Sequence, residues 1–346
     1  MPNPCFIPTG YRPALEIRAL ESAIKDIKDF FERALAGALN LHRVTAPLFV
    51  RSDTGINDDL NGVERPVRFP VKEDGDAQVE IVQSLAKWKR LALARYGFQP
   101  GEGLYTDMNA LRPDETLDNI HSIYVDQWDW EQILWPDRRH LQTLKDAVEA
   151  IYGAICRTEF HIASQHPQIR PILPERISFI TSEELCARYP DLPPRERENR
   201  VCQELQAVFV IGIGADLADG QPHDGRAPDY DDWLTPNSDG GRGLNGDLLL
   251  WNPVLQRAFE ISSMGIRVDP ETLLTQLQIR GLSARQELPF HRLLLADGLP
   301  QTMGGGIGQS RLCMFFLRTA HVGEVACGIW PDEMVQRCAE ANITLL

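Results

Sequence analysis

The run from Met303 to Leu312 joins three consecutive glycines, a fourth glycine at position 308, and Arg311. Glycines let a backbone approach a ligand closely, and the apolar residues that follow predict a helix. A helix N-terminus offers backbone N–H groups to an anion, and an arginine matches the geometry of a phosphate. The run matches neither the Gly-Lys-Ser/Thr phosphate loop nor the spaced dinucleotide fingerprint. A flexible glycine turn before a core helix remains the alternative.

A second arginine, Arg112, comes directly before Pro113. Because proline cannot donate to a sheet ladder, Arg112 is predicted to lie where a strand enters a loop. An arginine at such a place can reach a phosphate in a cleft. The alternative is a surface ion pair with Asp114 or Glu115.

Two carboxylates, Asp247 and Glu260, belong to segments that predict a hairpin turning near residues 252 and 253. Antiparallel strands can place both carboxylates at one end of a sheet. Mg²⁺ takes one or two carboxylates together with substrate phosphates, so this pair is a candidate magnesium site. A hairpin end capped by charges is the alternative.

The segment 124–131 alternates in a strand-like way. Alternation places Gln127, Asp129 and Glu131 on one face and two tryptophans on the other. The tryptophans indicate burial on their side, and three polar residues on a half-buried strand suit a substrate cleft. A solvated face is the alternative.

Three further segments carry clustered charge. Residues 226–233 hold three carboxylates within four positions, which repel one another unless a cation is near. Residues 53–62 form a turn-rich acidic segment, and 84–90 carry Lys87 and Lys89, either of which could serve an α-carboxylate. A solvated loop or helix face is the alternative for each.

Together, these residues describe a nucleotidyl-transfer site for an amino acid. The arginines suit phosphates, some of the acids suit magnesium, and the other acids suit an ammonium group of the substrate.

The bulk composition narrows the class of protein. The formal net charge of −14 over 346 residues argues against nucleic acid as a partner. The seven cysteines are scattered without metal-type spacing, which predicts thiols in a reducing compartment. The sequence contains no secretory signal and no apolar stretch near the about 20 residues that a membrane span needs. We therefore expect a cytoplasmic protein that binds no membrane.

The elements that must position these residues predict an α+β fold. Periodicity predicts helices over 14–39, 84–97 and from 141 to Phe160, with Phe160 on the apolar side. Extended segments are predicted at 41–49, 79–82, 104–108, 123–130, 177–180, 208–213, 247–251 and 258–262. Irregular spacing of these elements favours an antiparallel β-sheet flanked by helices. We expect residues 1–346 to form a single catalytic domain with an irregular segment at about 214–246.

Three runs resemble the motifs of class II aminoacyl-tRNA synthetases: Val44–Pro47, Arg112 and its neighbours, and Gly304–Arg311. A closer resemblance is to the ammonia-dependent aspartate–ammonia ligase family, also called the asparagine synthetase A family. The runs that carry it are Ser84–Arg90, Gly101–Thr106, Tyr124–Trp130, Arg226–Trp233 and Ser262–Val268. The similarity extends from about residue 15 to the C-terminus, whereas the first dozen residues match nothing familiar.

The resemblance implies a class II synthetase-like core, a homodimer, and a reaction in which L-aspartate, ATP and ammonia give asparagine, AMP and pyrophosphate. The side-chain carboxylate would first be adenylated, with Mg²⁺ as cofactor. Catalysis would involve Asp58, Arg112 and Gln127. Aspartate or asparagine would be bound by Lys89, Gln127, Asp129, Asp231 and Ser263. The nucleotide would be bound by Arg112, Ile120, Val125, Asp247, Glu260, Ser262 and Arg311, and the metal by Asp247 and Glu260. Gln83 departs from the histidine expected near the nucleotide.

Three other functions remain open. An aspartyl- or asparaginyl-tRNA synthetase normally carries an anticodon-binding domain ahead of its core, whereas here the core-type sequence begins within the first fifty residues. A non-catalytic sensor of ATP and aspartate need not keep Arg112, Glu260 and Arg311 together. Glutamine-dependent amide synthesis needs a glutaminase domain with an activated cysteine, and the sequence displays neither.

Overall fold

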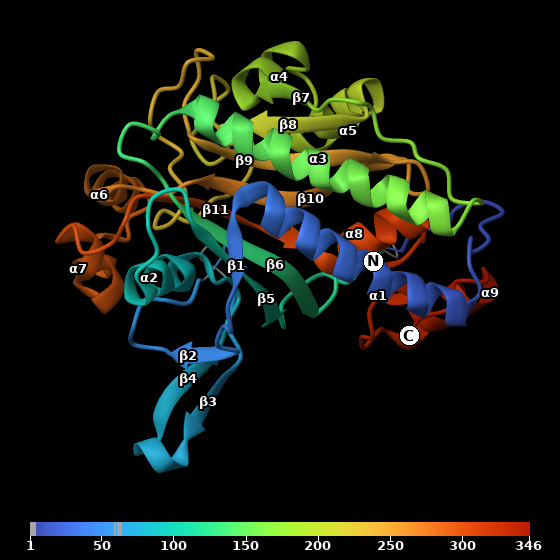
Figure 1. The fold of residues 1–346 in the computed structure, drawn as a ribbon, viewed down its shortest axis with the longest axis horizontal. Helices are drawn as coiled ribbons and strands as arrows, with labels where there is room; N and C mark the ends of the chain where they lie inside the picture. The colour runs from blue at the N-terminus through green and yellow to red at the C-terminus, as the bar shows by residue number, and fades with distance from the viewer. Residues whose placement is uncertain (1–4, 59, 61–63) are drawn as a thin grey trace.

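An eight-stranded sheet forms the centre of the protein, which we describe from a computed structural model covering residues 5–58, 60 and 64–346 (Figure 1). In spatial order its strands are β1 (Leu41–Arg43), β5 (Gly103–Leu111), β6 (Tyr124–Ile133), β11 (Thr302–Gly308), β10 (Arg257–Ile266), β9 (Asn245–Asn252), β8 (Ala207–Ile211) and β7 (Ser178–Thr181). The six strands from β5 to β8 pair antiparallel, as predicted. The edge strands β1 and β7 pair parallel to their neighbours, which the sequence pattern did not predict.

The largest apolar core lies on one face of this sheet, under α1 (Ile17–Leu39), α3 (Leu141–Gln165) and α8 (Gln309–Leu317). Trp128 and Trp130 of β6 are fully buried in it, as the alternation of this strand predicted. In Figure 1, α1 and α3 run side by side across this face. Phe160 of α3 is an exception to the predicted apolar side, because 65% of it is exposed.

Shorter helices cover the opposite face. Near β5, β6 and β11 lies α2 (Ala86–Tyr96), and against β8, β9 and β10 lies α5 (Pro194–Leu205). The side chain of Ser84 accepts the N–H of Ala86, and Gly97 ends α2 in the left-handed conformation, so the prediction for 84–97 is confirmed. The remaining helices are α4 (Ser182–Arg188), α6 (Pro270–Ile279), α7 (Pro289–Leu295), α9 (Asp332–Glu340) and the 3₁₀ turns η1 (Lys72–Asp74), η2 (Ser283–Glu287) and η3 (Val322–Glu324).

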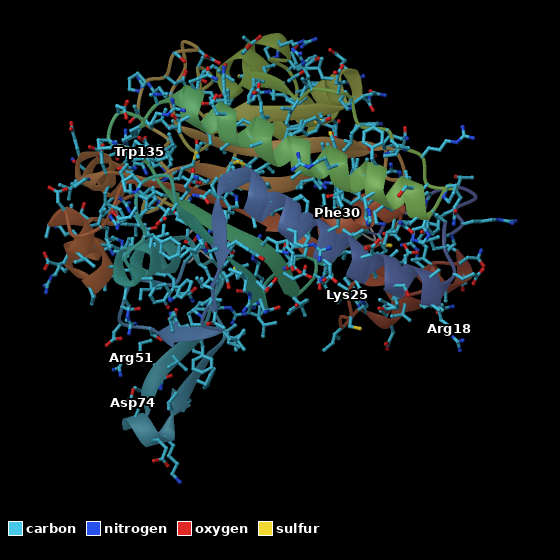
Figure 2. All side chains as sticks on the ribbon, in the orientation of Figure 1. Arg18, Lys25, Phe30, Arg51, Asp74 and Trp135 are labelled. Atoms are coloured by element: carbon cyan, nitrogen blue, oxygen red, sulfur yellow. The ribbon has the colours of Figure 1, made fainter. Side chains whose placement is uncertain are left out.

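A second sheet of three strands, in the order β2 (Phe49–Arg51), β4 (Ala77–Ile81) and β3 (Arg68–Val71), projects away from the main body (Figure 1). Figure 2 labels Arg51 and Asp74 on this projection, where Arg51 Nη1 lies 2.6 Å from Asp74 Oδ2. The predicted extended run 41–49 is thus divided between two sheets. Its first three residues form the edge strand β1 of the main sheet, and its last residue begins β2 of the second sheet. Part of the acidic segment 53–62, namely 59, 61 and 62, falls outside the described residues.

The glycine run is a strand and not the flexible turn that the sequence left open as an alternative. Gly304, Gly305 and Gly306 lie in β11 and pair with β6 and β10. A Cβ on Gly304 would lie 2.0 Å from the Glu131 carboxylate, and one on Gly306 would lie 2.2 Å from the Gln127 amide. Gly304 and Gly306 are therefore required because side chains of β6 occupy the space above them, whereas Gly305 is required because Met264 of β10 lies against it.

The helix that follows does not present all its N–H groups to a ligand. The N–H of Ser310 donates to the carboxylate of Asp126 at 2.9 Å, and Lys28 pairs with the other oxygen of that carboxylate. An internal anion thus occupies part of the predicted anion site. Within the described residues, no helix is both long and apolar enough to span a membrane.

Candidate active site

The polar residues on the α2 side of the main sheet surround a cavity of about 450 Å³. It is bounded by strands β6, β10 and β11, the start of α2, and the loops near 58, 112–122 and 224–231. The predicted residues that line it are Asp58, Lys89, Arg112, Ile120, Val125, Gln127, Asp129, Asp231, Glu260, Ser263 and Arg311. Asp247 and Ser262 lie behind this lining, where Asp247 contacts Arg226 and Ser262 donates to the carbonyl of Gly306.

Lys89 is wholly buried on the floor of the cavity. Its Nζ donates to the carboxylate of Asp129, to the carbonyl of Trp130 at 2.9 Å and to the carbonyl of Gly305 at 3.0 Å. Since an ammonium group has three protons, Lys89 could meet a substrate carboxylate only by exchanging one of these acceptors. Asp129 Oδ2 has no hydrogen-bond partner among the described residues, so this oxygen is available to a ligand.

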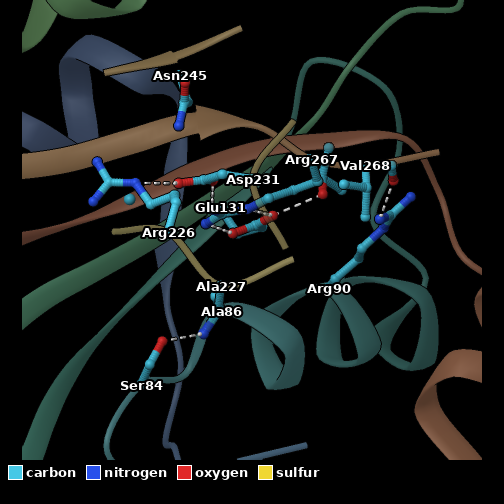
Figure 3. A network of polar contacts seen from close by, with 12 residues as sticks. Ser84, Ala86, Arg90, Glu131, Arg226, Ala227, Asp231, Asn245, Arg267 and Val268 are labelled. Atoms are coloured by element: carbon cyan, nitrogen blue, oxygen red, sulfur yellow. Dashed lines mark hydrogen bonds and ion pairs between the residues drawn. The ribbon is translucent and has the colours of Figure 1, made fainter. Parts of the chain in front are cut away.

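Arg267 holds the next part of the floor with a two-pronged contact (Figure 3). Its Nε and Nη2 donate to the two oxygens of Glu131 at 2.9 and 2.7 Å, and its Nη1 donates to Asp231. Burial raises the pKa of Glu131, but the charges of Arg267 and Lys89 outweigh it, so the net shift is downward. Glu131 therefore stays ionised as a support for the cations around it.

At the other end of this network, Arg226 contacts two carboxylates, those of Asp231 and Asp247. Its guanidinium binds Asp247, and its Nε lies 3.8 Å from Asp231 Oδ2. Burial raises the pKa of Asp231 and of Asp247, and their arginine neighbours offset this rise only in part. Figure 3 shows Asp231 placed between Arg226 and Arg267. The two carboxylates are therefore better proton acceptors than ordinary aspartates.

The three carboxylates between 229 and 232 are buried, so the solvated-loop interpretation is wrong. Each has its own cation, as their mutual repulsion requires. Asp231 faces Arg267, Asp232 faces Arg139, and Asp229 Oδ2 lies 3.0 Å from Lys87 Nζ.

At the nucleotide end, Arg112 lies directly after β5, where a strand enters a loop. Its Nε is buried with no partner among the described residues, and Asp114 pairs with Arg65 instead. Arg311, in the first turn of α8, donates to the carbonyl of Glu260 at 3.1 Å and lies 3.6 Å from its carboxylate. Both arginines are thus placed to meet a phosphate.

The sequence did not assign a role to Arg226 or Arg267, although both lie in runs that carry the family resemblance. Gln83 is a third residue of interest, because it is fully buried on the cavity wall and both polar atoms of its side chain lack a partner among the described residues. A buried arginine within a strand-like segment and an amide beside a helix start are weak signals in a single sequence. The importance of the two arginines depends on partners far away in the chain.

Comparison with known proteins gives a consistent result. The family model described as aspartate–ammonia ligase matches residues 18–342. An aspartate–ammonia ligase of Clostridium perfringens strain 13 is 59% identical over 341 residues, which is 99% of each chain. That of Bacteroides fragilis strain ATCC 25285 is 56% identical over 339 residues, which is 98% of each chain.

Solved structures show the same fold at low identity. Asparaginyl-tRNA synthetase from Pyrococcus horikoshii, complexed with asparaginyl-adenylate, matches 91% of this chain and 71% of its own with a TM-score of 0.66 and 17% identity. The Entamoeba histolytica asparaginyl-tRNA synthetase in complex with asparaginyl-adenylate matches 90% of this chain and 66% of its own with a TM-score of 0.64 and 13% identity. The predicted class II aminoacyl-tRNA synthetase-like core is confirmed.

Proposed function

The chain belongs to the aspartate–ammonia ligase family and makes L-asparagine from L-aspartate, ammonia and ATP, and we propose that the cavity on the main sheet carries out both steps. In the first step the side-chain carboxylate of aspartate attacks the α-phosphate of ATP and releases pyrophosphate. In the second, ammonia attacks the β-aspartyl-adenylate and releases AMP.

The floor of the cavity is the observation that carries the proposal. The floor cations are Lys89, Arg226 and Arg267, and the floor carboxylates are Asp129, Glu131, Asp231 and Asp247. Three cations against four carboxylates leave an excess negative charge in a buried place, which favours a cationic ligand. We assign the α-ammonium of aspartate to Asp129 Oδ2, Asp231 and Gln127. Lys89 and Ser263 then meet the α-carboxylate.

We assign the adenylation step to the arginines. Arg112 would bind the α-phosphate, where negative charge builds as the carboxylate attacks, and Arg311 would bind the outer phosphates. Ile120, Val125 and Ser262 would form the AMP pocket. The cavity lining supports the arginines, Ile120 and Val125, whereas Ser262, which lies behind the lining, is assigned from the family resemblance alone.

Mg²⁺ fits the carboxylates at the nucleotide end. The side chain of Glu260 is 46% exposed, and its contact with Arg311 is long at 3.6 Å, so its oxygens can accept a hard cation. Asp247 faces Arg226 and would have to share its oxygens with the metal. When bound, Mg²⁺ supplies positive charge to the phosphates of ATP.

We assign proton removal from ammonium to Asp58, which lines the same cavity as Arg112 and Gln83. Only NH₃ attacks the adenylate, whereas NH₄⁺ predominates near neutral pH, so a carboxylate at this place can act as a general base. Asp231, whose pKa burial raises, is the second candidate.

We further propose that residues 1–346 act as one catalytic domain in a cytoplasmic homodimer that binds neither membrane nor nucleic acid. The apolar residues Leu48, Phe49 and Phe69 are exposed next to the run Val44–Pro47, which offers a surface for a second copy. Light scattering during size-exclusion chromatography tests the dimer.

The experiment that tests the function incubates the full chain with ATP, Mg²⁺ and aspartate, with and without ammonium chloride, and measures asparagine, AMP and pyrophosphate. Ammonium-dependent formation of the three in equal amounts is expected. Pyrophosphate exchange without asparagine would favour an adenylating enzyme with another acceptor, such as tRNA, and binding without turnover would favour a sensor. In Asp58→Asn, exchange should persist while asparagine formation falls, and normal asparagine output would exclude the role of Asp58.

A further inference from the structure

Three potential metal ligands meet near the two ends of the chain, away from the cavity. They are Cys5, His321 and Cys338, all buried, and their ligand atoms lie within 4.8 Å of one another. Cys5 belongs to the N-terminal segment, His321 precedes η3, and Cys338 lies in α9. Because Cys5 lies 333 positions before Cys338, spacing along the sequence could not reveal the cluster.

The distance between the two sulfurs fits a soft tetrahedral cation as well as it fits a thiol–thiol hydrogen bond. Cys5 Sγ and Cys338 Sγ are 3.9 Å apart. Zinc–sulfur bonds of about 2.3 Å at the tetrahedral angle place two sulfurs about 3.8 Å apart. The third group, His321, is fully buried, and its Nε2 has no hydrogen-bond partner among the described residues. We propose that Cys5, His321 and Cys338 bind one Zn²⁺ ion.

The hydrogen bonds of His321 define what binding requires. Its Nδ1 accepts the N–H of Gly323 at 3.0 Å, so a neutral ring carries its proton on Nε2. Ligation through Nε2 moves this proton to Nδ1 and exchanges the Gly323 bond for the metal bond. The two thiols release their protons. Within the described residues no fourth protein ligand joins the cluster, so a water or a small thiol completes the tetrahedron.

The proposed ion would connect the N-terminal segment to a wall of the cavity. Asn119 donates to the carbonyls of Phe6 and Ala320 and accepts the N–H of Phe6, which ties the N-terminal segment to the segment before His321. The backbone N–H of Val322 donates to the carbonyl of Asn119 at 2.7 Å, and Val322 and Ile120 line the cavity. A bound ion therefore fixes the N-terminal segment against the wall where we place the nucleotide.

The test titrates the reduced full chain with Co²⁺, whose thiolate charge-transfer and tetrahedral visible bands report the ligands, and measures Zn²⁺ by mass spectrometry. One equivalent per chain is expected, and Zn²⁺ should raise the melting temperature. Cys5→Ser and Cys338→Ser should each weaken binding by more than the about 10–100-fold that loss of an outer-shell partner costs. The control is Cys327→Ser, because Cys327 is exposed and outside the cluster, and it should bind like the unaltered protein.

Three results would overturn the site. The first is the absence of a Co²⁺–thiolate spectrum in the reduced, folded protein. The second is a spectrum unchanged in both Cys5→Ser and Cys338→Ser, which would place the metal at other cysteines. The third is a count of two thiols fewer than the seven cysteines after purification without reductant, with no spectrum after reduction, which would identify a disulfide. If Cys5→Ser does not fold, Cys338→Ser carries the comparison.

Discussion

Lys87 and Lys89 lie two positions apart on α2, yet they belong to different buried networks. Lys89 reaches the cavity floor, where it donates to Asp129 and to two backbone carbonyls. Lys87 reaches Asp229, whose Oδ2 also lies 3.0 Å from His291 Nε2 and 3.3 Å from Arg285 Nη1. The residue types alone left open which lysine serves the substrate, whereas the family resemblance implied Lys89, and the structure places only Lys89 in the lining of the cavity on the main sheet.

The two networks differ in the balance of their charges. On the floor, carboxylates outnumber cations by four to three, and one oxygen of Asp129 faces the cavity without a partner among the described residues. Around Asp229, one carboxylate meets a lysine, an arginine and a histidine. We propose that a cationic ligand completes the floor, whereas the cations around Asp229 already outnumber its single negative charge, although Asp229 Oδ1 also lacks a partner among the described residues. The first should therefore govern activity and the second stability.

The largest expected effect is that of Lys89→Met. Removing one partner of a buried, hydrogen-bonded charge pair costs about 2–5 kcal/mol of binding free energy, and each 1.36 kcal/mol changes a rate tenfold, so kcat/KM for aspartate should fall about 10³-fold. The loss arises because Asp129 and Glu131 lose the charge that orients them. ATP–pyrophosphate exchange measures it, with circular dichroism to confirm the fold. If the folded variant keeps a kcat/KM for aspartate within tenfold of the parent, Lys89 does not serve the substrate in the way that distinguishes it from Lys87.

A second test acts on the other network through Asp229→Asn. Burial raises the pKa of Asp229, but Lys87, His291 and Arg285 lower it more, so the folded pKa lies well below its ordinary value. Its contribution is fully present above the unfolded pKa of about 3.9 and is lost as the pH falls through the folded pKa. The variant should be about 3 kcal/mol less stable at pH 7, because buried cations lose their partner.

Urea unfolding at pH 7, 5 and 4 measures this difference. The gap between Asp229→Asn and the parent should be the same at pH 7 and pH 5 and should begin to narrow at pH 4, since the carboxylate of the unfolded parent then takes up protons while that of the folded parent stays ionised. A gap that widens toward pH 4 would mean that Asp229 is neutral in the folded protein.

Local patterns predicted the side chains whose direction depends on one strand. The period of two in β6 placed Gln127 and Asp129 toward the cavity and Trp128 and Trp130 in the core, and burial of the tryptophans confirms that division. The hairpin of β9 and β10 and the helix that ends at Gly97 were predicted for the same reason. Each feature rests on residues within a few positions of one another.

Features that depend on distant partners were not predicted. Glycine at 304–306 is typical of a loop, and only contacts across the ladder explain why a strand needs it: the Glu131 and Gln127 side chains at 304 and 306, and Met264 at 305. The pairing of Arg267 with Glu131 joins residues 136 positions apart, and nothing in either local segment indicates the other. The parallel edge strands likewise depend on connections and not on residue type.

The third prediction concerns Lys87→Met. Asp229 keeps His291 and Arg285, so the variant should lose about 1.5–3 kcal/mol, the usual worth of a hydrogen bond to a charged group. Activity per folded molecule should stay within about threefold of the parent, because Lys87 does not line the cavity. Urea unfolding and specific activity measured on one preparation separate the two effects. Lost activity at unchanged stability would place Lys87 in the chemistry.

The smallest expected effect lies at the exposed rim, in Glu260→Gln. A neutral amide is a poorer ligand for Mg²⁺ than a carboxylate, so the Mg²⁺ concentration for half-maximal pyrophosphate exchange should rise about tenfold. Stability should change little, since the Glu260–Arg311 pair is long and exposed. A matched control is Glu271→Gln, because Glu271 is an exposed glutamate in the first turn of α6 and lies outside the cavity lining.

The Mg²⁺ dependence decides between two roles for Glu260. If it binds the metal, excess Mg²⁺ should restore most of the rate in Glu260→Gln. If it only positions Arg311, excess Mg²⁺ should leave the rate low, and KM for ATP should rise at every Mg²⁺ concentration. Restoration of the rate by excess Mg²⁺ would extend the comparison between the two networks. It would show that the loss of an exposed carboxylate with a distant partner can be offset by a higher concentration of the metal in solution. Asp129, which is buried beside Lys89, admits no such compensation.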